Sequence, residues 1–200
     1  MFKKRGKELL LDLVVGLAWL VYAAAYLRHA LDSHSLPGLG LMIFYTLVAV
    51  FFFLRAPNQK RCAWWETALA VGGVFLPIAL LRPVEGRSGA APLLGGIIQT
   101  LALAGIILAL ISLGRSFGIA PADRGLVTRG LYRWIRHPLY AMETWFYVGF
   151  LVANPAWRNL AGLLLCLAVQ VIRIRREERI LSGYESYANT VRWRLLPLVW

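Results

Sequence analysis

Long apolar stretches alternate with short polar segments along the first 113 residues. Each of four stretches holds about the 20 apolar residues that a helix needs to cross a bilayer. They cover residues 9–27, 36–54, 63–81 and 92–113. Two later stretches, 139–153 and 160–172, are shorter. At about 1.5 Å per residue, neither crosses a core of about 30 Å without its polar flanks, so the pattern predicts a bent helical hairpin that turns at Asn154 and Pro155.

The composition indicates that lipid is the solvent of this chain. Of its 200 residues, 59% are hydrophobic and 16% are charged, and the mean hydropathy is +0.61. These values lie outside the range of soluble globular domains. The first stretch is too long for a signal peptide and carries Asp12, so we keep it as a span. We expect an all-α integral membrane protein, a multi-pass helical bundle with four full spans plus the hairpin, or five to six crossings.

The charges predict an orientation. With six crossings, all but four of the 22 Lys and Arg residues fall on one side of the membrane. The exceptions are Arg28, Arg82, Arg87 and Arg158. By the positive-inside rule, both termini and the 115–136 loop are cytoplasmic. The net charge of +12 then reflects orientation and attraction to anionic headgroups, and no nucleic-acid partner is expected.

No metal site or common nucleotide motif is expected. Cys62 and Cys166 are the only cysteines, and His29 and His34 have no third ligand near them in the sequence. The chain also lacks a Walker loop and the glycine fingerprint of a dinucleotide fold. A nucleotide-like cofactor would therefore need a different kind of pocket.

The organisation changes at Gly114, which separates N-terminal transmembrane helices (1–113) from a region that we expect to be catalytic (114–200). The segment 114–138 is rich in Gly and Arg, and a loop of this length is more often functional than a bare connector. It ends in Arg136 and His137 at the membrane surface, with Pro138 where a helix can begin. A basic, aromatic interfacial belt is the alternative interpretation.

Both arms of the hairpin carry charge. Glu143 lies in an otherwise apolar segment, where an acid costs roughly 2.5–3.5 kcal/mol, so it is functional unless it sits at the interface. The second arm ends in a run of Arg and Glu residues, in which Arg173 and Glu177 share one helix face. An anchor with intrahelical ion pairs is the alternative interpretation of this run.

A hairpin brings its two ends together, so one polar constellation is predicted at the cytoplasmic face. Its members are Tyr132, Arg136, His137, Tyr140, Glu143, Arg173, Glu177 and Glu178. Carboxylates suit ribose hydroxyls or an ammonium group, Arg or His suits a carboxylate, and aromatic rings suit a sulfonium. The inventory favours a zwitterionic, cationic cofactor.

These residues resemble the signature of the isoprenylcysteine carboxyl methyltransferase family. The resemblance rests on residues 125–132, 136–140 and Arg173 with the Glu177-Glu178 pair, and it covers 114–200. It implies a membrane methyltransferase that uses S-adenosyl-L-methionine. Two features depart from the family: the stretch before Tyr184 is short, and Ser182 replaces the usual Phe before Gly183. Tyr184 and Tyr187 fit the family pattern but also fit interfacial anchors, so they stay outside the predicted site.

The resemblance also implies roles for single residues. Arg173 would orient the acceptor carboxylate, and Glu143 and Arg136 complete the predicted catalytic set. The implied cofactor contacts are Arg124, Gly125, Leu126, Val127, Tyr132, His137, Pro138, Leu139, Tyr140 and Glu177. No metal takes part.

The implied reaction is direct methyl transfer to a lipophilic or prenylated substrate drawn from membrane lipid, with the carboxylate of a prenylcysteine-like molecule as the favoured acceptor. A carboxylate is already ionised at neutral pH and needs no general base. An amine or thiol acceptor would need proton removal by Glu143, Glu178 or His137. A phospholipid, amine or small-thiol methyltransferase with the same pocket, and an NADPH-dependent membrane reductase, remain as alternatives.

Overall fold

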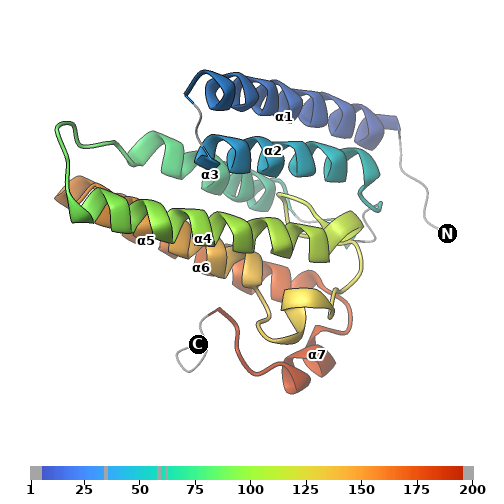
Figure 1. The fold of residues 1–200 in the computed structure, drawn as a ribbon. Helices are drawn as coiled ribbons and strands as arrows, with labels where there is room; N and C mark the ends of the chain where they lie inside the picture. The colour runs from blue at the N-terminus through green and yellow to red at the C-terminus, as the bar shows by residue number, and fades with distance from the viewer. Residues whose placement is uncertain (1–5, 34–35, 58–59, 62, 196–200) are drawn as a thin grey trace.

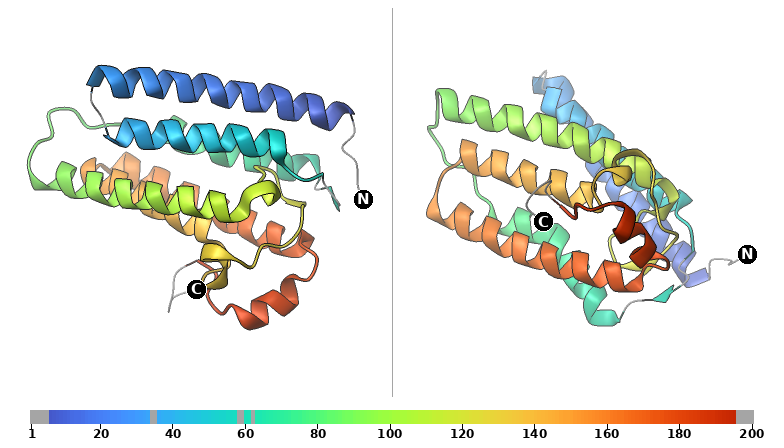
Figure 2. Two further views of the ribbon diagram at one scale, coloured as in Figure 1. Left: turned by 45° about the vertical axis from the view of Figure 1, so that its right-hand side comes forward. Right: turned by 90° about the horizontal axis from the view of Figure 1, so that it is seen from below.

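The computed structural model describes residues 6–33, 36–57, 60–61 and 63–195. Six long helices lie side by side within this part of the chain (Figures 1 and 2). They are α1 (Gly6–Ser33), α2 (Leu36–Leu54), α3 (Trp64–Leu80), α4 (Ala90–Leu113), α5 (Pro138–Ala153) and α6 (Trp157–Ile180), and a short α7 (Tyr184–Thr190) follows them. The protein is an all-α, multi-pass membrane protein, as the hydropathy pattern predicts.

The helices follow the predicted apolar stretches. By length and composition α1, α4 and α6 are sufficient to cross a membrane, whereas α2 and α3 are apolar but shorter. The second hairpin arm is long enough to span once its polar flanks are included, as predicted: α6 has 24 residues, or about 36 Å at 1.5 Å per residue. The helix does not stop at Arg173, because this arginine is buried inside the bundle. The 16 residues of α5 form a helix of about 24 Å, which is shorter than the hydrocarbon core of about 30 Å, as expected.

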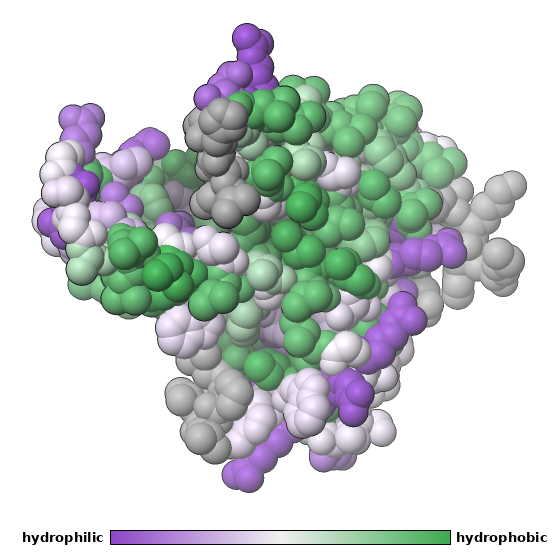
Figure 3. Space-filling model, viewed as in Figure 1, coloured by the Kyte–Doolittle hydropathy of each residue, from purple (hydrophilic) through white to green (hydrophobic). Residues whose placement is uncertain are grey.

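Close packing joins α4 to α5 in the middle of the bundle. A Cβ atom added at Gly95 would lie 2.5 Å from the carbonyl oxygen of Gly149, so both positions require glycine for this backbone approach. On one side of this pair α2 packs against α4. On the other side α6 packs against α5, and α3 packs against α6. Figure 3 shows apolar surface across the middle of the bundle and hydrophilic surface towards the ends of the helices, as expected for a protein surrounded by lipid.

The apolar first helix carries an acid that is paired. Asp12 is buried, with 3% of its surface exposed, and it accepts a hydrogen bond from the guanidinium of Arg55 just beyond α2. The same guanidinium lies over the ring of Phe52, 4.6 Å from its centroid. A paired carboxylate near the start of α1 avoids the cost of an isolated charge in lipid.

Most of the polar segments lie at one end of the bundle. The start of α1, the end of α2, the 114–137 segment, the end of α6 and α7 all lie there, and we call it the loop end (Figures 1 and 2). Two short strands, Lys60–Arg61 (β1) and Ala122–Asp123 (β2), pair antiparallel at this end. The chain after α7 runs back beside the 114–137 segment, where Ile135 forms a parallel bridge with Trp193.

Candidate active site

The loop end of α5 and the loop end of α6 meet in a polar cluster. The Tyr140 hydroxyl donates to Glu177 at 3.0 Å, and His137 Nε2 lies 3.2 Å from Glu178 Oε1. His137 is the last residue before α5, and Pro138 begins the helix, where its missing N–H costs no hydrogen bond. Residues about 40 positions apart in the chain therefore share one site, as the hairpin predicts.

A second set of hydrogen bonds lies deeper, between the bodies of α5 and α6. Gln170 Nε2 donates to Glu143 at 3.0 Å, and the Thr144 hydroxyl donates to Gln170 Oε1 at 2.8 Å. Gln170 and Thr144 are both buried. Glu143, which is half-buried, is therefore held between the two helices by its hydrogen bond from Gln170.

Arg173 is buried between three segments of the chain. Its Nη2 donates to the Ile119 carbonyl at 3.3 Å, and its guanidinium lies 5.1 Å from the centroid of the Tyr140 ring. A Cβ atom added at Gly73 of α3 would meet the Arg173 side chain at 3.2 Å, so the glycine leaves room for the arginine. The alternative interpretation, an intrahelical pair, does not describe these contacts: within the described chain, Arg173 contacts Ile119 and Tyr140, while Glu177 accepts from Tyr140.

The 114–137 segment, α6 and α7 enclose a small cavity beside this cluster. It is lined by Leu113, Ser116, Ala122, Arg124, Gly125, Leu126, Val127, Tyr132, Arg136, His137, Glu177, Leu181, Tyr184 and Tyr187. Seven of the ten predicted cofactor contacts are among these residues. The other three, Pro138, Leu139 and Tyr140, are not: Leu139 packs against the apolar cluster around Phe117, and Tyr140 faces Arg173 and Glu177.

Two arginines in this region each have a buried N–H group that could donate a further hydrogen bond. In the part of the chain that the structure describes, Nε of Arg136 and Nε of Arg173 are buried without a hydrogen-bond partner. Arg136 reaches the Tyr184 hydroxyl and the Arg192 carbonyl through its other nitrogens. A buried N–H without a partner is costly, which indicates a ligand with an acceptor group.

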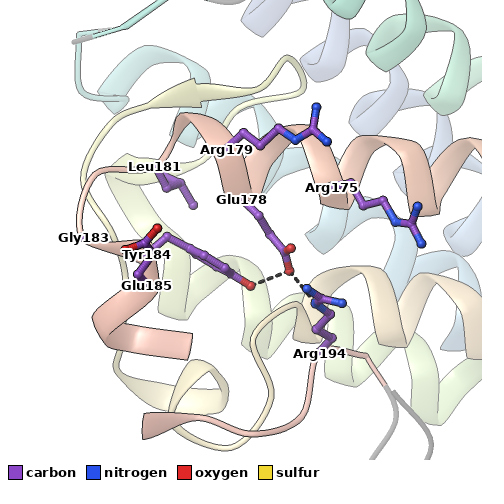
Figure 4. Close-up of a pocket in the computed structure, with 8 residues that line it drawn as sticks. All are labelled: Arg175, Glu178, Arg179, Leu181, Gly183, Tyr184, Glu185 and Arg194. Atoms are coloured by element: carbon purple, nitrogen blue, oxygen red, sulfur yellow. Dashed lines mark hydrogen bonds and ion pairs between the residues drawn. The ribbon is translucent and has the colours of Figure 1, made fainter. Parts of the chain in front are cut away.

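The end of the chain closes the site from outside. The backbone N–H groups of Arg136 and His137 donate to the carbonyls of Trp193 and Arg194 at 2.8 and 2.9 Å. Glu178 Oε1 accepts from Arg194 at 3.1 Å and from the Tyr184 hydroxyl, in addition to its contact with His137 (Figure 4). One carboxylate thus holds α5, α6, α7 and the last described segment together.

Sequence reasoning left out two tyrosines of this site. Tyr184 and Tyr187 are buried and line the cavity, so they are not the interfacial anchors of the alternative interpretation. Burial raises the pKa of Tyr187 to about 12, and its protonated hydroxyl donates to the Tyr132 carbonyl. Their three-residue spacing on α7 was the signal that could have found them. Asp123 was also missed: it is buried and accepts from the backbone N–H groups of Gly125 and Ser182.

The comparison with known families decides the class of the protein. The model of the phospholipid methyltransferase family matches residues 89–189, from the beginning of α4 to α7. The match includes every element that builds the cavity and just over half of the chain. The chain belongs to the phospholipid methyltransferase family. A search of curated proteins finds no match.

Membership supports membrane methyltransferase activity, and members of this family generally use S-adenosylmethionine. The resemblance seen in the sequence therefore identified the correct broad class. The family named by the match is that of phospholipid methyltransferases, and a specific isoprenylcysteine carboxyl methyltransferase is not confirmed.

The donor set of the methyltransferase fits the cofactor that its family uses. Glu177 offers a carboxylate, Arg136 an unpartnered Nε, and Tyr132 an aromatic ring, which suit a ribose, a carboxylate and a sulfonium. The cavity itself holds about 30 Å³, room for about one water molecule. Leu181 and Tyr184 line both this cavity and a larger groove of about 770 Å³, which Figure 4 shows.

The structure forms no metal cluster within the residues that it describes, since no three His, Cys, Asp or Glu side chains gather there. His29 lies in α1, whereas His34 and Cys62 lie outside the described residues. Cys166 is a buried, unbridged cysteine of α6.

Proposed function

We propose that the protein transfers the methyl group of S-adenosylmethionine to the polar head of a lipophilic acceptor that reaches the site from the membrane. The observation that carries the proposal is the convergence of Arg136, His137 and Glu177 on one cavity, with Arg173 and Glu143 deeper between the helices. The polar side chains at the loop end suit a water-soluble cofactor. Arg173 and Glu143, which lie deeper among apolar helices, suit the polar head of a lipid substrate.

The cofactor contacts follow from the cavity lining. Arg124, Gly125, Leu126, Val127, Tyr132, His137 and Glu177 would surround the cofactor. The Arg136 guanidinium would donate through Nε to its carboxylate, and Glu177 would accept from a ribose hydroxyl or the ammonium group. When bound, the sulfonium supplies an activated methyl group. Gly125, with φ of 98°, lets the backbone of the 114–137 segment turn towards the cavity.

An amine head group is the first candidate acceptor, and the family description favours it. A primary ammonium has no free electron pair, so it must lose a proton before nitrogen can take the methyl group. Glu143 is the carboxylate placed for this role, because Gln170 holds it between α5 and α6. Glu143 would accept the proton that the ammonium releases, and the neutral nitrogen could then take the methyl group that the bound sulfonium would supply.

A carboxylate is the second candidate acceptor, as in a prenylcysteine. The buried guanidinium of Arg173 favours it, because Nε has no partner among the described residues and could hold one carboxylate oxygen. The other oxygen would take the methyl group without any proton transfer. Alignment and exclusion of water would then supply the rate enhancement.

A labelling experiment separates the two acceptors. Purified protein in nanodiscs is incubated with S-adenosylmethionine labelled at the methyl group, together with phosphatidylethanolamine or with a farnesylcysteine analogue. Methyl esters release labelled methanol in alkali, whereas N-methyl products keep the label. Glu143→Gln is expected to abolish amine methylation and to leave carboxyl methylation unchanged. Failure to label either substrate, in protein shown to be folded, would contradict the proposal.

The orientation and the division of the chain form part of the same proposal. The loop end carries the excess of Lys and Arg, so it would face the cytoplasm. The 1–113 region would embed the protein and line the approach of the acceptor, and the 114–200 region would carry the catalytic groups. Accessibility of a single cysteine introduced at Thr128, an exposed residue of the loop end, tests the orientation in intact cells.

A further inference from the structure

The large groove at the loop end adjoins the proposed active site, with which it shares Leu181 and Tyr184. It holds about 770 Å³, within the range of ligand-binding sites, and it is lined by Arg175, Glu178, Arg179, Leu181, Gly183, Tyr184, Glu185 and Arg194. Figure 4 shows the Glu178 carboxylate bonded to Tyr184 and Arg194, while the guanidinium groups of Arg175 and Arg179 extend from α6 without reaching it. The groove is lined by three arginines and two acids, Glu178 and Glu185, and no ion pair joins Arg175 or Arg179 to either acid in the described part of the chain.

Arg175 and Arg179 occupy the face of α6 opposite to the active site. Arg173 and Glu177 point into the bundle, and a shift of two residues corresponds to about 200° around a helix. Arg175 and Arg179 are both exposed, and neither forms an ion pair within the described part of the chain. Because they are four residues apart, they lie one above the other and can contact one anion together.

The same face of α6 is apolar where the helix enters the bundle. Leu165, Ala168 and Ile172 continue the spacing of Arg175 and Arg179 towards the opposite end of the helix. All three are exposed, with Leu165 at 49% and Ile172 at 43%. A single stripe thus begins as a lipid-facing apolar surface and ends in two arginines at the mouth of the groove.

We propose that this stripe binds a phosphate-bearing lipid, with an acyl chain along Leu165, Ala168 and Ile172 and the phosphate on Arg175 and Arg179. Arg194 faces the same groove, where it is paired with Glu178 at 3.1 Å. An arginine pair matches the oxygens of a phosphate, and the adjoining apolar stripe matches a tethered acyl chain rather than a free anion. This lipid site is separate from the acceptor site and does not depend on methyl transfer.

The test compares three probes on detergent-purified full-length protein. Dioctanoyl phosphatidylglycerol carries both a phosphate and acyl chains, dioctanoylglycerol carries only the chains, and inorganic phosphate carries only the anion. Lipid binding is measured by native mass spectrometry and by the shift in thermal unfolding. Tight binding is expected only for phosphatidylglycerol. Displacement of that lipid by inorganic phosphate at equal concentration, or equal binding of dioctanoylglycerol, would overturn the assignment.

Variants locate the site. The double substitution R175Q/R179Q is expected to weaken phosphatidylglycerol binding about 10- to 30-fold, since each arginine near a membrane surface contributes a separate attraction to an anionic lipid. The matched control R129Q/R133Q removes the same two charges from exposed positions of the loop end and should change binding less than about twofold. Equal weakening by both pairs would mean only a general charge effect and would refute the site. S-adenosylhomocysteine binding should persist in both pairs, which separates this test from that of the proposed function.

Discussion

Replacing Arg173 with glutamine is expected to slow methyl transfer far more than it weakens cofactor binding. Arg173 is 8% exposed, and its side chain faces Tyr140 and Ile119 rather than the small cavity. A hydrogen bond to a charged group is worth about 1.5–3 kcal/mol, so loss of the contact with a carboxylate acceptor slows transfer roughly 10- to 150-fold. Glutamine keeps a polar side chain but lacks the charge and the fork of donors.

The assay measures kcat for the carboxylate substrate and, separately, the affinity for S-adenosylhomocysteine. The matched control is Arg176→Gln on the same helix, because Arg176 faces Glu66 at 3.8 Å and the ring of Trp65, away from the site. The control should retain kcat within about twofold, as expected of a surface change. Unchanged kcat together with lost cofactor affinity in Arg173→Gln would refute the role given to this arginine.

Three further outcomes follow from the geometry. His137→Ala and Glu177→Gln should each weaken S-adenosylhomocysteine binding by about 1–3 kcal/mol without unfolding the protein, as calorimetry and thermal unfolding would show; equal loss of folded protein would indicate a structural role. Gly149→Val should prevent recovery of folded protein, because its Cβ would lie 2.8 Å from the Gly95 carbonyl oxygen, whereas Gly96→Ala meets nothing within 4 Å and should be tolerated in size-exclusion chromatography. Tyr187→Phe should cost about 1–3 kcal/mol of stability by leaving the buried Tyr132 carbonyl without its donor, and an unchanged unfolding midpoint would contradict that bond.

The helices could be predicted from the sequence because lipid leaves few alternatives. A backbone in hydrocarbon must satisfy its own hydrogen bonds, so every long apolar stretch becomes a helix. In α6 the helix continues beyond the apolar stretch that ends at Ile172. Six of the eight residues from 173 to 180 are charged, and Arg173 and Glu177 have partners inside the protein.

The site could be predicted only for residues that the connection between two neighbouring helices brings close together. The turn between α5 and α6 brings His137 and Tyr140 to Glu177 and Glu178, and this follows from the hairpin alone. The path of the chain after α7 could not be predicted in this way, because the bridge between Trp193 and Ile135 depends on contacts between segments that are far apart in the sequence. For the same reason the structure was needed to place Tyr184 and Tyr187 of α7 in the cavity lining and to find Asp123 of β2.

Calorimetric titration of the detergent-purified protein with S-adenosylhomocysteine tests the central claim most directly, with the His137→Ala variant and NADPH as controls. The account predicts saturable binding by the wild-type protein, weaker binding by the variant, and no binding of NADPH. Absence of S-adenosylhomocysteine binding in a folded sample, or saturable binding of NADPH in its place, would contradict it.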